Sequence, residues 1–147
     1  MRFNFGVMQG RLSKKINNKI QAFPEKNWKR EFKIAKNLNL KLIEWTLDYK
    51  NLYKNPLMTK NGRKAIIKLQ NKYSISIHSL TGDCFMQKPF WKISKNSKRL
   101  LDFQNIIFSC GQIGIKYIVV PLVDRGSLNN SSEENFLIRT INKFSKF

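Results

Sequence analysis

Hydrophobic and polar positions along the chain divide it into four similar units. Each unit opens with a short apolar run that ends in polar or acidic residues, and a stretch with helical periodicity follows. The runs recur at intervals of about 35 to 40 residues, the length of a strand, a helix and a return turn in a parallel α/β sheet. They occupy residues 3–8, 42–46, 75–80 and 117–123. The pattern predicts four parallel strands, each followed by a helix.

Apolar residues at three- and four-residue spacing predict where the helices lie. The first helix is expected over residues 27–38 and the second over residues 61–73. Asn61 and Gly62 are expected to open the second helix. Asn96 or Ser97 is expected to cap the third helix, and Gly111 and Gly114 to close it. Ser131 or Ser132 is expected to start the last helix, which covers residues 136–147. Pro121 falls inside the fourth apolar run and lacks a ladder donor, so it is expected to mark a bulge or the exit of the strand.

Four β-α units with parallel strands make half of a (β/α)8 TIM barrel, so the expected fold class is α/β with half-barrel architecture. The 147 residues are expected to form a single domain, 1–147, truncated after the fourth β-α unit. Four strands alone leave two unpaired edges and an apolar inner face without cover. The chain is therefore expected to be a truncated product, to be completed by a second half-barrel, or to pair edge to edge with a second copy as a homodimer. In isolation we expect self-association or poor solubility.

The formal net charge of +19 has two interpretations. A field of this size attracts nucleic acid, anionic lipid or phosphorylated metabolites in a salt-dependent way. Lysine outnumbers arginine by 21 to 7, however, and the lysines are spread over all the expected helices. Together with 16 Asn and 16 Ile, this is typical of compositional drift in an AT-rich genome, and proteins that read nucleic acid usually rely on arginine. Drift is the interpretation that we favour, with a functional anion-attracting surface as the alternative.

The sequence predicts a soluble cytoplasmic protein without a membrane partner. Its first ten residues lack the long apolar segment and cleavage site of an export signal. No stretch approaches the roughly 18 apolar residues that a membrane span requires. Cys84 and Cys110 lie far apart without paired metal-binding spacing, and both are expected to be reduced thiols.

Carboxylates are scarce, and four of the nine fall at or just beyond the end of an expected strand. These four are Glu44, Asp48, Asp83 and Asp124. A ring of carboxylates can bind a divalent cation, hold sugar hydroxyls or transfer protons, whereas the alternative is that acids act as caps and turn formers. Glu44 is the strongest candidate, because it interrupts an apolar strand beside Trp45, where a carboxylate without function carries a desolvation cost. We expect a polar site at this end of the sheet.

Gln9, Arg11 and His78 complete the candidate set. Gln9 and Arg11 follow the first strand and bring an amide and a guanidinium, which suit hydroxyls or a phosphate. His78, the single histidine, is expected near the end of the third strand, either in the site or as a hydrogen-bonded residue that lines the sheet. One imidazole cannot supply the ligands of a catalytic zinc site. The sequence also lacks a glycine-rich phosphate loop and a nucleophile elbow, so nucleotide hydrolysis and serine hydrolase chemistry have no support.

Several short motifs resemble the opening of a known protein family. They are GVMQGRLS at 6–13, QAFP at 21–24, Trp28, EF at 31–32, IEW at 43–45, NPL at 55–57, Gly62 and the segment 79–86. On these motifs the chain resembles, along essentially its whole length, bacterial sugar phosphate isomerase/epimerase proteins of the xylose isomerase-like TIM-barrel superfamily. It departs at Asn39, where such proteins commonly turn on glycine, and at Cys84, where an aromatic residue is usual.

The resemblance implies aldose-ketose isomerisation or epimerisation of a sugar or sugar phosphate in the full-length family, by metal-assisted proton transfer. The divalent metal (Mn, Mg, Zn or Co) is typically held by Glu, Asp, His and Glu from the later strands, and the catalytic acid and base come largely from the same half. This chain is therefore expected to be a substrate-side half without a cofactor of its own, and no catalytic residue is assigned.

The expected substrate-binding residues are Gln9, Arg11, Glu44, His78, Asp83 and Asp124. The alternative function is a non-catalytic, basic binding fragment that docks on nucleic acid or another acidic partner.

Overall fold

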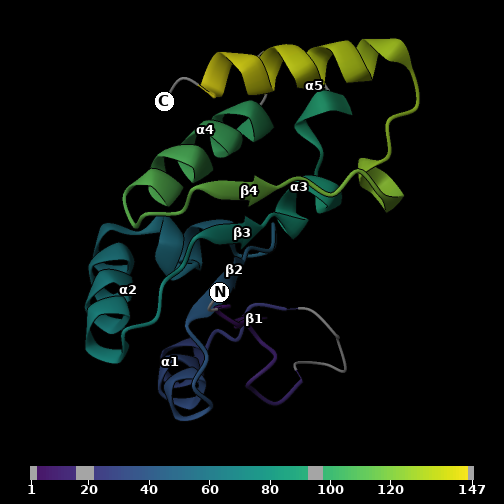
Figure 1. Cartoon of the computed structure of the whole chain (residues 1–147). Helices are drawn as coiled ribbons and strands as arrows, with labels where there is room; N and C mark the ends of the chain where they lie inside the picture. Colours follow the sequence, from purple (N-terminus) through teal and green to yellow (C-terminus); the bar gives the residue numbers. More distant parts are fainter. Residues whose placement is uncertain (1–2, 16–21, 93–97, 146–147) are drawn as a thin grey trace.

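A parallel sheet of four strands forms the centre of the molecule (Figure 1). The computed structural model describes residues 3–15, 22–92 and 98–145. The strands are β1 (Gly6–Met8), β2 (Leu42–Thr46), β3 (Ser79–Thr81) and β4 (Tyr117–Val119). They lie in the order β1-β2-β3-β4, and each neighbouring pair is parallel. The predicted α/β fold with four parallel strands is confirmed.

Helical segments follow each strand, and α1, α2 and α4 gather on one side of the sheet (Figure 1). The α-helices are α1 (Trp28–Asn37), α2 (Lys60–Tyr73), α3 (Asp83–Gln87), α4 (Lys98–Gly111) and α5 (Ser131–Phe144). Single 3₁₀ turns lie in the connections: η1 (Leu52–Lys54), η2 (Pro56–Met58), η3 (Phe90–Lys92) and η4 (Asp124–Gly126). The sequence predicted the long helices but not the short α3 or these turns.

β3 begins later than its apolar run predicted. The run covers residues 75–80, but the strand starts at Ser79, and the residues before it make only an isolated bridge between Leu42 and Ser76. The Ile77 amide donates to the Gln70 side-chain oxygen at 3.0 Å, so it is taken away from the ladder. The fourth run likewise forms a strand only as far as Val119. Pro121 therefore lies beyond the exit of β4, one of the two places predicted for it.

Side-chain caps fix the starts of two helices. α2 begins at Lys60, one residue before the predicted Asn61, and Thr59 caps it by accepting a hydrogen bond from the Gly62 amide at 3.0 Å. α5 begins at Ser131, one of the two predicted starting residues, and Asn130 caps it by accepting from the Glu133 amide. Each cap offers a side-chain oxygen directly before the first helical residue. The predicted caps Asn96 and Ser97 of α4 lie outside the described residues.

The turn before β2 explains why the resembled proteins use glycine there. Asn39 has a φ of 57°, in the left-handed region that disfavours most side chains. Asparagine tolerates this region better than other non-glycine residues because its short side chain can bond locally. The departure from glycine at Asn39 therefore preserves the turn between α1 and β2.

The hydrophobic core lies between the sheet and the helices on its covered side. Side chains alternate along a strand, and Ile43, Trp45 and Leu80 all point into this core with exposed fractions of 0–1%. From α1, the Trp28 ring meets the Trp45 ring edge-on at 5.7 Å. The Trp45 indole N–H donates to Asn55 Oδ1 at 3.1 Å, so this large buried ring leaves no polar atom unsatisfied.

The opposite face of the sheet carries no such cover from the described helices. Glu44, Ser79 and Thr81 lie on this face, together with Tyr117 and Val119, which are in register with Ser79 and Thr81. Tyr117 is 67% exposed and Val119 is 48% exposed, unusual values for strand residues of an α/β sheet. We call this surface the open face. Thr81 is nevertheless 7% exposed, so the open face is most exposed along the edge strand β4.

Two further expectations concern cysteines and membranes. Cys84 and Cys110 are buried free thiols, and burial raises the pKa of Cys110 to about 12 and that of Cys84 well above its ordinary value. Such thiols behave as small core residues and are poor nucleophiles. Among the described residues, none of the helices combines the length and apolar character that crossing a membrane requires.

Candidate functional site at the carboxyl end of the sheet

Glu44 lies in the middle of β2 on the open face, where two hydroxyls of β3 hold its carboxylate. Ser79 Oγ donates to Glu44 Oε2 at 2.9 Å, and Thr81 Oγ1 donates to Glu44 Oε1. Ser79 and Thr81 are alternate residues of the neighbouring strand, so the parallel arrangement brings both hydroxyls to the same face. Each carboxylate oxygen keeps further acceptor capacity. Glu44 can therefore accept hydrogen bonds from a ligand while the protein fixes its position.

Gln9 directly follows β1 and is anchored to β2. Its amide N–H donates to the Glu44 carbonyl at 2.9 Å, and its carbonyl accepts from Thr46 Oγ1 at 3.2 Å. The side chain is 1% exposed, and its Nε2 is buried without a hydrogen-bond partner within the described part of the chain. Leaving a buried donor unsatisfied costs about 1–3 kcal/mol. A hydroxyl or carbonyl oxygen of a ligand at this position would recover that cost.

Glu31 of α1 holds the turn that follows Gln9. One carboxylate oxygen accepts from the Gly10 amide at 3.0 Å and from the Leu12 amide at 3.2 Å, and the other accepts from Gly10 at 2.9 Å. Burial raises the pKa of the Glu31 carboxyl above its ordinary value of 4.5, and hydrogen bonds from Gly10, Ser13 and Leu12 oppose that rise. Gly10 has a φ of 90°, which favours glycine. Glu31 thus fixes the chain on both sides of Arg11.

The sequence reasoning did not select Glu31 as a site residue, since an acid in the first turn of a helix is ordinary. The one available signal was that Glu31 lies on the same helix face as Trp28 and Phe32, where a solvated acid is not expected.

The remaining candidates occupy different parts of the same edge. Arg11 is exposed in the connection after β1, and its amide donates to the Met8 carbonyl at 3.3 Å. Asp83 is buried at the first position of α3, after β3. Asp124 is exposed at the start of η4, after β4, and η4 packs against α3. Arg11, Asp83 and Asp124 therefore lie beyond the carboxyl ends of β1, β3 and β4, respectively.

His78 is placed differently from its expected position near the end of a strand. It directly precedes β3, at the amino end of that strand, and it is exposed. Its carbonyl accepts hydrogen bonds from the amides of Lys116 and Tyr117 at 2.9 and 3.0 Å. His78 is therefore separated from the carboxyl edge by the length of β3, and its observed role is to join β3 to β4 through its backbone.

Asp48 links the connections that surround this edge. Its carboxylate accepts from the Phe23 amide at 3.1 Å and from Gln87 Nε2 at 2.8 Å. Gln87 Oε1 in turn accepts from the Tyr49 amide at 2.8 Å. The carboxylate thus ties the segment before α1 to α3, which supports the turn-forming alternative for this acid.

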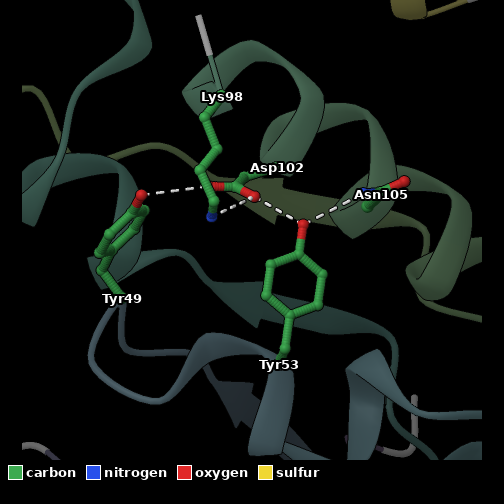
Figure 2. A network of polar contacts seen from close by, with 5 residues as sticks. All are labelled: Tyr49, Tyr53, Lys98, Asp102 and Asn105. Atoms are coloured by element: carbon green, nitrogen blue, oxygen red, sulfur yellow. Dashed lines mark hydrogen bonds and ion pairs between the residues drawn. The ribbon is translucent and has the colours of Figure 1, made fainter.

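A second network fixes the β2–α2 connection to α4 (Figure 2). The buried carboxylate of Asp102 accepts from Tyr49 OH at 3.1 Å and from Tyr53 OH at 2.6 Å, while Lys98 lies 3.4 Å away. Asn105 donates to the Tyr53 hydroxyl at 3.1 Å. Burial, followed by the hydrogen bond to Asp102, raises the pKa of both tyrosines. This network joins the β2–α2 connection to α4 and does not include Glu44.

The divalent metal that the family resemblance implies does not fit the residues described. No group of three or more His, Cys, Asp and Glu side chains lies close enough to hold a metal ion in residues 3–15, 22–92 and 98–145. The nearest partners of the Glu44 carboxylate are hydroxyls, which are weak ligands compared with carboxylates or imidazoles. We therefore derive no chemical step through a metal.

Comparisons with known proteins leave the family open. The chain matches no protein-family model, and a search of curated proteins gives no match either. The resemblance to sugar phosphate isomerases and epimerases consequently rests on the sequence motifs alone.

Proposed function

We propose that this chain is the substrate-side half of a (β/α)8 barrel that binds a sugar or sugar phosphate at the carboxyl ends of its strands. The observation that carries the proposal is Glu44, a carboxylate held by two hydroxyls on the open face. Gln9, whose backbone amide donates to the Glu44 carbonyl, adds a buried side-chain Nε2 that has no hydrogen-bond partner within the described part of the chain. Carboxylate and amide groups are well suited to hold the hydroxyls of a polyol. In the complete barrel, the activity is isomerisation or epimerisation.

The half-barrel architecture has support from strand order and burial. Sequential parallel strands joined by helices on one side are the arrangement from which a closed barrel is built. The exposed Tyr117 and Val119 occupy positions that other strands cover in a closed barrel. The additional strands would come from a second copy or from another half-barrel segment.

The residues of this chain serve to bind and orient the ligand. Glu44 accepts hydrogen bonds from ligand hydroxyls, and Gln9 Nε2 donates to a ligand oxygen. Glu31 acts through the Gly10 and Leu12 amides, so it is a positioning residue for the turn that carries Arg11. The proton transfer between neighbouring carbons is assigned to groups of the complementing half, where the resemblance places the acid, the base and the metal.

Binding of a neutral sugar tests the proposal without interference from the large positive charge. Calorimetric titration with fructose should give weak binding, and Glu44→Gln should weaken it by about tenfold, since the variant loses a charge-assisted acceptor. The matched control is Glu134→Gln, which removes the same charge from an exposed position on α5. The control should bind as the wild type does.

Two results would contradict the proposal. One is equal weakening in both variants, and the other is no detectable binding to wild type at sugar concentrations of about 10 mM, beyond the usual range of specific ligand affinity. The basic-fragment alternative predicts instead that nucleic acid binds with a steep salt dependence and that Glu44→Gln leaves this dependence unchanged.

A further inference from the structure

A cavity of about 510 Å³ lies between the connection that precedes α1 and the connection that follows β2. Its volume is within the range of small-molecule sites, about 300–1,000 Å³. Three lysines line it: Lys14, Lys26 and Lys50. They come from three separate positions in the sequence, so the fold, and not a local run of basic residues, gathers them around one space.

The cavity is distinct from the site around Glu44. Phe23 lines it, and the Phe23 ring packs against the Trp45 ring at a centroid distance of 5.4 Å. Trp45 is on the helix-covered face, whereas its neighbour Glu44 points to the open face. The cavity therefore lies at the covered side of the same sheet end, and a substitution of Glu44 leaves its lining unchanged.

The lysines of the cavity have no partners within the described part of the chain. None of the three side chains makes a hydrogen bond, an ion pair or a ring contact there. Unpaired ammonium groups around a shared cavity repel one another, and an anion between them removes that repulsion. The arrangement thus favours a negatively charged occupant.

Two carboxylates also line the cavity, and the protein already uses both. Asp48 accepts from the Phe23 amide and from Gln87 Nε2, at 3.1 and 2.8 Å. Glu25 accepts from Asn51 Nδ2 at 3.3 Å. The lining has three positive and two negative charges. Its side-chain donors without a hydrogen bond in the described part of the chain are the three lysine ammonium groups and the side-chain amide of Asn27. Most of the side-chain donors left for a ligand are therefore cationic.

We propose that this cavity binds a small organic phosphate. A phosphate monoester carries a charge of about −1.5 to −2 at neutral pH and three acceptor oxygens, which suit the ammonium groups of three exposed lysines that line one cavity. Phe23 and Pro24 provide an apolar wall for the organic part of the ligand. The site goes beyond the binding of a sugar at Glu44 and does not depend on it.

The test compares two triple variants of equal charge. Lys14, Lys26 and Lys50 are replaced by Gln in the first variant, and the exposed Lys36, Lys64 and Lys68 on α1 and α2 are replaced by Gln in the control. Both lose the same charge, so the general attraction of anions falls equally. Glycerol phosphate is titrated into each protein by calorimetry at fixed ionic strength, with glycerol as the uncharged counterpart.

We expect the cavity variant to lose binding by more than about tenfold, the control to lose less than about twofold, and glycerol not to bind. Inorganic phosphate should compete with glycerol phosphate. Equal losses in the two variants would overturn the site, because the field of the whole protein would then explain the binding, and so would the absence of binding to wild type. Glu44→Gln should leave this binding unchanged, which separates the outcome from that of the sugar site.

Discussion

The two faces of one sheet have opposite characters. On the covered face, Trp45 and Leu80 are completely buried against the helices. On the open face, Tyr117 and Val119 remain exposed and Glu44 is held by the hydroxyls of β3. Because side chains alternate along a strand, neighbouring residues such as Glu44 and Trp45 serve the two faces separately. The covered face supplies the packing, and the open face is the one to which we assign ligand binding.

This division, and the hydrogen-bond networks on the helices beside the sheet, can be tested by four substitutions with different expected effects on the free energy of unfolding.

Trp45→Phe or Trp45→Ala should have the largest effect. Trp45→Ala removes a buried ring that contacts Trp28 and Phe23 and leaves Asn55 Oδ1 with one donor fewer, for an expected loss of about 3–5 kcal/mol. Trp45→Phe should lower the free energy of unfolding by less, because a phenyl ring keeps most of the contacts with Trp28 and Phe23. Denaturant unfolding followed by circular dichroism measures both losses. A loss below about 1 kcal/mol for Trp45→Ala would show that the covered face is not the stabilising one.

Glu31→Ala should lower the free energy of unfolding by about 1–3 kcal/mol, because the Gly10 and Leu12 amides would lack their acceptor.

Glu31 should also make the stability depend on pH. Burial raises the folded-state pKa of Glu31 above 4.5, so protonation of this carboxyl favours the folded state. The stability of the wild type relative to Glu31→Gln should therefore fall as the pH rises from 4.5 through the raised folded-state pKa. Unfolding curves over this range measure the difference. Glu134→Gln is the control, and an equal pH dependence for it would contradict the role of Glu31.

Asp102→Asn should lower the free energy of unfolding by about 1–2 kcal/mol. The two tyrosine hydroxyls donate to different oxygens of the carboxylate, and the asparagine side chain has only one oxygen. Asp102 contributes to the raised pKa of Tyr49 and Tyr53, so the variant should lower the pKa of both hydroxyls. Ultraviolet titration of tyrosinate measures this change, with Tyr73→Phe and Tyr117→Phe used to assign the signals of the other two tyrosines. Unchanged tyrosine titration would show that the network of Figure 2 does not form in solution.

Val119→Lys on the open face should have the smallest effect on stability, within about 0.5 kcal/mol, because this side chain is 48% exposed. It should nevertheless reduce self-association, since it places a charge on a surface expected to pair with other strands. Sedimentation velocity of wild type and variant measures this. A wild type that is monomeric at all concentrations, or a variant that associates equally well, would contradict the pairing of open faces.

Much of the fold could be predicted from the sequence because apolar runs and helical spacing are local signals. The bounds of β2 follow directly from its run, and parallel pairing follows from the alternation of strands and helices. The start of β3 could not be predicted, because it depends on the contact between the Gln70 side chain and the Ile77 amide. The five-residue α3 is too short to show helical periodicity.

The candidate site was predicted in part for similar reasons. Glu44 stood out because a carboxylate interrupts an apolar strand, and the parallel register brings the β3 hydroxyls to it. The role of Glu31 was missed because its partners, the Gly10 and Leu12 amides, lie far from it in the sequence. The cavity could not be predicted, because the fold brings its three lysines together from separate segments. His78 was placed at the wrong end of its strand because the apolar run extends beyond the ladder.

The most direct test of the division between the two faces is NMR chemical-shift mapping of the isotope-labelled protein during titration with fructose. If the open face binds the sugar, the side-chain amide of Gln9 and the backbone amides of Ser79 and Thr81 should shift together, while Ile43 and Leu80 on the covered face should not. Shifts confined to the covered face, or a Gln9 side-chain signal that stays fixed while other signals move, would contradict it.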